Sequence, residues 1–69
     1  MLIKITLQRH TNCWLATFEN HPTMPNGQPL PLPWGEHTSV IDVAKDMRTR
    51  FIGAIVFYRG LDGMRHHCP

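Results

Sequence analysis

The stretch SVIDVAKDMRTRFIGAIVFYR, residues 39–59, decides the fold, because it holds a helix pattern followed by a strand pattern. Ser39 is a good N-cap residue, and Asp42 stands three positions later in a capping-box arrangement, with Asp in the usual Glu position. Gly53 is a residue type that commonly ends a helix. Apolar residues recur at spacings of three and four between these ends, which predicts a helix over residues 40–52 with one buried stripe: Val40, Val43, Ala44, Met47 and Phe51.

The second part of the stretch predicts a strand over residues 54–59. Apolar side chains stand on both of its faces, which is typical of a strand that is covered on both sides. We expect Ile55 and Phe57 to face the helix. Val56 and Tyr58 then face the opposite side of the sheet.

Two further strands are predicted before the helix. Residues 2–8 alternate between apolar and polar side chains, and residues 14–18 resume that alternation. The polar residues 9–12 between them contain turn-forming Thr and Asn. Two alternating segments joined by a short polar turn predict an antiparallel hairpin.

The segments on either side of the helix and last strand are predicted to be loops. Residues 19–38 hold five of the chain's six prolines, and proline restricts both its own backbone and that of the preceding residue. The alternation of Pro with Leu predicts stiff, polyproline-like chain, which Leu30, Leu32 and Trp34 would pack against the core. Residues 60–69 predict a turn followed by loose chain.

These elements predict a single α+β domain over residues 1–69, with ββαβ order and a three-stranded sheet that carries one helix on one face. The helix crossover is expected to place the last strand parallel to the second. The other face of the sheet needs a cover, which is either the proline-rich loop or a second copy of the chain, and we favour a homodimer. The residues predicted for this interface or partner-binding surface are Lys4, Thr6, Leu15, Trp34, Val56 and Tyr58.

Composition narrows the class of protein. The net charge of +2 is too small to predict a strong electrostatic surface for nucleic acid, although the positive charges concentrate from Lys45 onward. Two cysteines are too few for a disulfide scaffold of this size. No apolar run reaches the length of a signal-peptide core or a membrane span, so we expect a cytoplasmic protein without membrane contact.

Candidate chemistry is sparse. His10, Cys13 and the terminal His66-His67-Cys68 are zinc-ligand types, but their spacing matches no common zinc site and the hairpin turn and the tail are expected to lie far apart. Cys13 beside His10 or His21 is the one candidate nucleophile pair, and a domain this small offers little cleft for it. We therefore predict no catalytic residues, no metal site and no cofactor.

The segment CWLATFENHP, residues 13–22, resembles the start of HicB-like antitoxin domains, in which a strand of the W-x-A-T-F type runs into a proline-containing segment. The resemblance covers about the first third of the chain. It implies a small α/β dimer that binds a protein partner. The chain departs from that family in lacking a Gly-Asp-type third strand and an appended DNA-reading domain, and no site residue is carried over.

The sequence thus predicts a small, non-enzymatic interaction module, a homodimer that binds another macromolecule such as a protein partner. A first alternative is a weak nucleic-acid binder that uses the open sheet face, with Tyr58 as a stacking residue, and the basic C-terminal half. A second alternative is a small enzyme that depends on zinc or on a cysteine.

Overall fold

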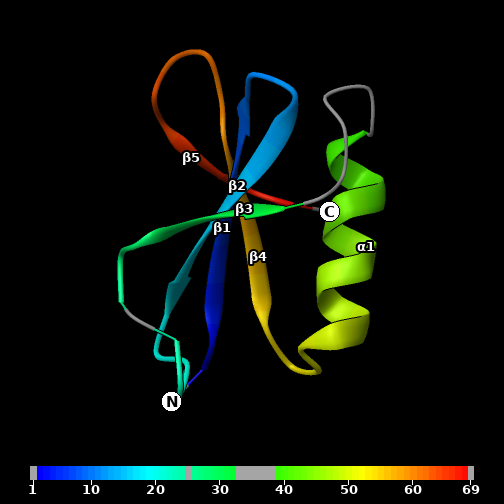
Figure 1. Cartoon of the computed structure of the whole chain (residues 1–69). Helices are drawn as coiled ribbons and strands as arrows, with labels where there is room; N and C mark the ends of the chain where they lie inside the picture. Colours follow the sequence, from blue (N-terminus) through cyan, green and yellow to red (C-terminus); the bar gives the residue numbers. More distant parts are fainter. Residues whose placement is uncertain (1, 25, 33–38, 69) are drawn as a thin grey trace.

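One helix packs on one face of a five-stranded mixed sheet in the computed structural model, which describes residues 2–24, 26–32 and 39–68 (Figure 1). The predicted α+β class is confirmed. In chain order the elements are β1 (Lys4–His10), β2 (Cys13–Glu19), β3 (Pro29–Leu32), α1 (Val40–Arg50), β4 (Ile55–Arg59) and β5 (Arg65–His67). Across the sheet the strands lie in the order β3-β2-β1-β4-β5.

The prediction of three strands is wrong, because two short edge strands form in segments that the sequence predicts to be loops. β3 lies within the proline-rich segment and pairs antiparallel with β2, with Leu30 opposite Ala16. β5 lies within the expected loose tail and pairs antiparallel with β4, with His66 opposite Tyr58. Proline is tolerated in a strand when it sits at a sheet edge.

The predicted neighbour of the last strand is also wrong. β4 is parallel to β1 and pairs with it, with Ile5 opposite Val56. Because β1 and β2 form an antiparallel hairpin, β4 runs opposite to β2. The second strand is unavailable to β4, since its other side is occupied by β3. β1 is therefore the central strand.

The facing of β4 is the reverse of the prediction. Val56 is opposite Ile5, which is fully buried under the helix, and Val56 itself is buried in the core. Phe57 is opposite Thr6 and lies on the other side of the sheet, as Ile55 does. Val56 and Tyr58 are consequently on the helix side. Ile55 and Phe57 belong to the face without a helix, which we call the open face.

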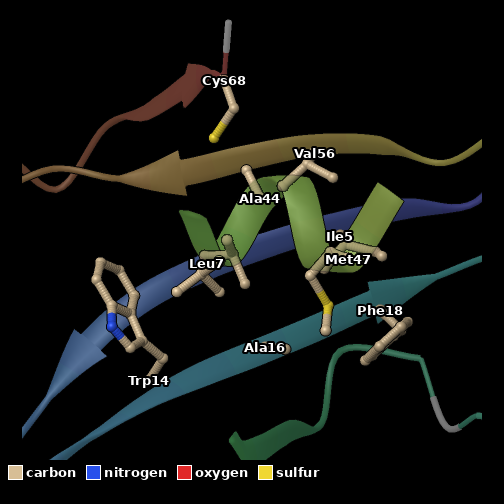
Figure 2. Close-up of a cluster of buried hydrophobic side chains, with 10 residues drawn as sticks. Ile5, Leu7, Trp14, Ala16, Phe18, Ala44, Met47, Val56 and Cys68 are labelled. Atoms are coloured by element: carbon tan, nitrogen blue, oxygen red, sulfur yellow. The ribbon is translucent and has the colours of Figure 1, made fainter. Parts of the chain in front are cut away.

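The core lies between α1 and the sheet face that it covers (Figure 2). Val43, Ala44 and Met47 supply the helix side, as the periodicity predicts. Leu30 and Leu32 of β3 pack against this core, whereas the predicted contribution of Trp34 lies outside the described residues. The buried members are Ile5, Leu7, Trp14, Ala16, Phe18, Val43, Ala44, Met47, Val56 and Cys68.

The ends of α1 follow from local hydrogen bonds. Ser39 Oγ accepts the backbone N–H of Asp42 (3.2 Å) and donates to Asp42 Oδ2 (3.0 Å), so the predicted N-cap is confirmed. The helix ends earlier than predicted, with Phe51 as C-cap, and Gly53 adopts φ 86° in the turn that follows. Within the described residues no helix is long and apolar enough to cross a membrane.

Candidate functional site

The open face carries three of the six predicted interface residues. Lys4 and Thr6 lie on it in β1, and Leu15 lies on it in β2, because each is in register with other residues of that face. Val56 and Tyr58 are on the helix side and are excluded from this surface by the reversed facing of β4. Trp34 lies outside the described residues.

A side chain from β5 crosses the open face. The guanidinium carbon of Arg65 lies 4.2 Å from the centroid of the Phe57 ring, which is a cation–π distance. Arg65 Nη1 is also 3.1 Å from Glu19 Oε1, so the side chain joins β5 to the far strand β2. Thr6, at the centre of the face, is only 6% exposed. The middle of the open face is thus covered by the protein's own side chains. This face therefore has less need of a covering partner than the sequence predicts.

The free edge of β3 is closed to further strands. Hydrogen-bonding groups of successive strand residues point alternately toward the neighbouring strand and away from it. Pro29 and Pro31 stand at alternate positions opposite Thr17 and Leu15, and proline is accommodated where its missing N–H would point outward. The outer edge of β3 therefore presents no N–H donor. This arrangement blocks strand addition on that side of the sheet.

The free edge of β5 is open. Gly60 N–H donates to the carbonyl of Met64 (3.1 Å), and Cys68 N–H donates to the carbonyl of Val56 (3.0 Å). These bonds and the register place the inward-pointing groups of β5 at the even positions 64, 66 and 68. The backbone N–H and C=O of Arg65 and His67 therefore point away from β4. In the sheet of described residues, β5 has a neighbour on one side only.

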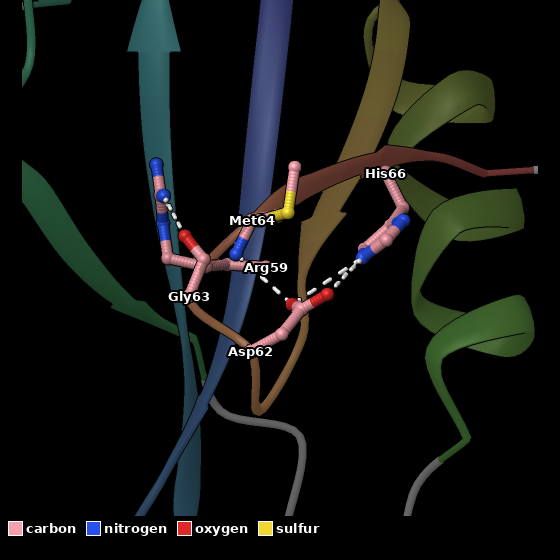
Figure 3. A network of polar contacts seen from close by, with 5 residues as sticks. All are labelled: Arg59, Asp62, Gly63, Met64 and His66. Atoms are coloured by element: carbon pink, nitrogen blue, oxygen red, sulfur yellow. Dashed lines mark hydrogen bonds and ion pairs between the residues drawn. The ribbon is translucent and has the colours of Figure 1, made fainter.

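The β4–β5 turn is held by a polar network (Figure 3). Arg59 Nη1 donates to the carbonyl of Gly63 (2.8 Å), and the N–H of Met64 donates to Asp62 Oδ1 (3.0 Å). This N–H lowers the pKa of the Asp62 carboxyl below its usual 3.8, and the nearby His66 adds to the effect, with Nε2 3.2 Å from Asp62 Oδ2. Gly63 adopts φ 76°, a conformation that favours glycine. The network sets the direction in which β5 leaves the turn.

The two cysteines lie apart in different surroundings. Cys13 is half-buried at the end of the hairpin, directly across from His10. Cys68 is 2% exposed and packs in the core, and its carbonyl accepts a hydrogen bond from Arg48 Nη2 (3.2 Å). Among residues 2–24, 26–32 and 39–68, no group of three or more His, Cys, Asp or Glu side chains is placed to hold a metal ion.

Cys68 is expected to make stability depend on alkaline pH. Burial raises the pKa of its thiol above the usual 9.0, partly offset by the charge of Arg48. Because the folded state holds this proton more tightly, the contribution is fully present below pH 9.0. It is lost as the pH rises from there through the higher pKa of the folded state. We expect Cys68→Ala to reduce the fall in the free energy of unfolding as the pH rises above 9.0.

Urea unfolding at a series of pH values would measure this effect. Cys13→Ala is the matched control, since that thiol is half-buried at the surface. The expectation fails if Cys13→Ala flattens the alkaline dependence and Cys68→Ala leaves it unchanged.

Sequence reasoning missed the residues that make the β5 edge distinctive. The sequence predicts a loose tail at Arg65 and His67 and places Phe57 on the helix side. A three-residue polar strand has no apolar alternation, so the only local signal was the turn residue pair Asp62-Gly63. Comparison with protein-family models, curated proteins and solved structures finds no match to this chain.

Proposed function

We propose that this chain is a small, non-enzymatic interaction module that associates with a second copy of itself through the free edge of β5. The observation that carries the proposal is the contrast between the two sheet edges. Prolines close β3, whereas no strand of residues 2–24, 26–32 and 39–68 pairs with the outward backbone groups of Arg65 and His67 in β5. Proteins usually protect the free edges of a sheet, but here the β3 edge is protected and the β5 edge is exposed. A protein partner with a free strand would use the same edge.

When β5 pairs with β5 of a second copy, the outward backbone groups of both copies form hydrogen bonds. In an antiparallel pair centred on His66, Arg65 stands opposite His67 of the second copy, and the reverse holds by symmetry. Both residues of each such pair point their backbone groups outward, so the pairing forms about four hydrogen bonds. Because like charges directly opposite one another are destabilising, a positive charge on His67 would weaken the pairing. The contact between Arg65 and Glu19 reduces that repulsion.

The free energies of hydrogen bonding, apolar burial and association indicate a weak dimer. About four backbone hydrogen bonds contribute about 2–6 kcal/mol, which lies below most of the range of about 4–15 kcal/mol for the cost of association. Apolar burial must supply the rest. Leu61 and Met64 are exposed at the tip of the β4–β5 hairpin, beside the edge that would pair. Covering such side chains contributes about 1.5–3 kcal/mol each, which brings the total near the cost of association, so we expect weak association that depends on protein concentration.

Replacing His67 by proline tests the edge directly. The change removes an outward N–H but no hydrogen bond of the β4–β5 ladder, so the fold is expected to persist while dimerisation is lost. His67→Ala is the matched control, because it removes the same ring and keeps the N–H. The measurement is the solution mass by light scattering over a concentration series, with circular dichroism to verify folding.

Dimerisation of the wild type and of His67→Ala, with a monomeric His67→Pro, would support the edge. Equal dimerisation of all three proteins would contradict it, as would a wild type that remains monomeric at millimolar concentration.

A further inference from the structure

A pocket of about 280 Å³ lies at the end of the sheet where β1 and β4 finish and α1 begins. Arg9 and Trp14 line it from the hairpin, Val40 lines it from the first residue of α1, and residues 58–61 line it from β4 and the turn beyond. β1 and β4 are the parallel pair of this sheet. The carboxyl ends of parallel strands, beside a helix start, are a common position for ligand sites in α/β structures. This place is distinct from the β5 edge.

An unsatisfied donor borders the pocket. Trp14 is 3% exposed, and its buried indole Nε1 has no hydrogen-bond partner among the residues that the structure describes. Figure 2 shows this nitrogen on the side of the ring that is turned away from Leu7 and the rest of the core. Buried polar groups in folded proteins nearly always have a partner, so an unpartnered indole N–H that borders a pocket indicates a missing acceptor.

A cation, Arg9, stands over the same space. The guanidinium carbon of Arg9 lies 4.9 Å from the centroid of the Trp14 ring, so the cation is held over the pocket's inner wall. Arg59 also lines the pocket, but its guanidinium is already engaged by the carbonyl of Gly63, and the N-terminus of α1 at Val40 carries its own acidic residue, Asp42. The nearby Asp62 is turned into its own hairpin by Met64 and His66. The Arg9 guanidinium and the Trp14 indole N–H are both donors, and a donor pair with one positive charge favours an anion.

The remaining lining is apolar. Tyr58, Val40 and Leu61 contribute a ring and two aliphatic side chains, and the Tyr58 ring is held in place by stacking on His66 at a centroid distance of 5.1 Å. The volume is near the lower limit of small-molecule sites, which is about 300 Å³. A ligand of this size is a single-ring or two-ring molecule, too small for a dinucleotide.

We propose that this pocket binds a small organic anion with a flat apolar body, such as an aromatic carboxylate. The carboxylate accepts hydrogen bonds from the Arg9 guanidinium and from the Trp14 indole N–H after a small shift of the ring edge. The flat body packs between Val40, Tyr58 and Leu61. None of the lining residues belongs to β5, although Leu61 is also one of the hairpin-tip side chains that the proposed dimer would cover.

The test uses 2-naphthoate as probe and its neutral isostere 2-naphthamide as control, with the indole N–H resonance of Trp14 followed by ¹H–¹⁵N NMR. Trp34→Phe identifies that resonance. We expect a saturable shift with naphthoate and at least about tenfold weaker binding of the amide, which corresponds to the loss of one charge-assisted contact. Arg9→Gln is expected to weaken naphthoate binding by a similar factor, and Arg9→Lys to retain the preference for the anion.

A second apolar groove provides the discriminating control. It is lined by Phe18, Met24, Met47 and Arg50 at the opposite end of α1, and it would also attract an aromatic anion. Arg50→Gln is expected to leave the titration of the Trp14 resonance unchanged. The proposal is overturned if the amide binds as tightly as the acid, if Arg9→Gln has no effect, or if Arg50→Gln abolishes binding. Absence of any shift of the Trp14 resonance at saturating probe also overturns it.

Discussion

Leu7→Ala is expected to lower the free energy of unfolding by about 2–5 kcal/mol, because it opens a cavity in the middle of the core. Leu7 is 0% exposed in the central strand β1, where it is flanked by Ala16 and Tyr58 on the neighbouring strands. A chain of 69 residues has a total stability of about 3–10 kcal/mol at the usual value per residue. The loss is thus a large part of the total stability, and the urea concentration at the unfolding midpoint should fall markedly.

Urea unfolding followed by circular dichroism measures this loss. Leu2→Ala is the matched control, because Leu2 is 58% exposed just before the same strand and the same atoms are removed. We expect that control to change the free energy of unfolding by less than about 0.5 kcal/mol. Similar losses in both variants would contradict the assignment of the core to the helix side of β1.

Val56→Asp is expected to abolish folding, because it places a carboxylate in the core with no partner. Val56 is 1% exposed, and burying an unpaired charge costs several kcal/mol or forces the group to bind a proton. The loss should exceed about 4 kcal/mol, which is a large part of the total stability. The measurement is the dispersion of the ¹H–¹⁵N NMR spectrum together with urea unfolding.

Ile55→Asp is the control that tests the facing of β4. Ile55 lies on the open face and is half-buried, so its carboxylate reaches solvent and we expect a loss of about 1–2 kcal/mol, with a dispersed spectrum retained. The reverse ranking of the two variants would restore the facing expected from the sequence and remove Phe57 from the open face.

The elements with a clear period were predictable from the sequence. The helix stripe at Val43, Ala44 and Met47 and its N-cap Ser39 follow from local spacing and chemistry, and the structure confirms them. Alternation in residues 2–8 placed Lys4 and Thr6 on the face away from the helix. These features depend on near neighbours in the chain, for which a side-chain period determines the buried face.

The facing of β4 could not be read from the sequence. Residues 54–58 are apolar without interruption, so either choice of face leaves apolar side chains toward the helix. Pairing with β1 determines the facing of β4, because the register that places Val56 beside Ile5 also places Phe57 beside Thr6. For this reason the predicted interface residues Val56 and Tyr58 lie on the helix side and not on the open face. A one-residue change of facing moves every side chain to the other side of the sheet.

The edge strands were decided by tertiary structure alone. Pro29–Leu32 has a sequence that disfavours strands in isolation, but β2 offers it an edge position where the prolines cost no hydrogen bond. Arg65–His67 has no apolar pattern, and it becomes a strand because the Asp62–Met64 turn returns the chain alongside β4. By itself the sequence determined the class, one helix and a hairpin. The strand order, the facing of β4 and the open edge of β5 depend on which segments lie side by side, and contacts between distant segments leave no period in the chain.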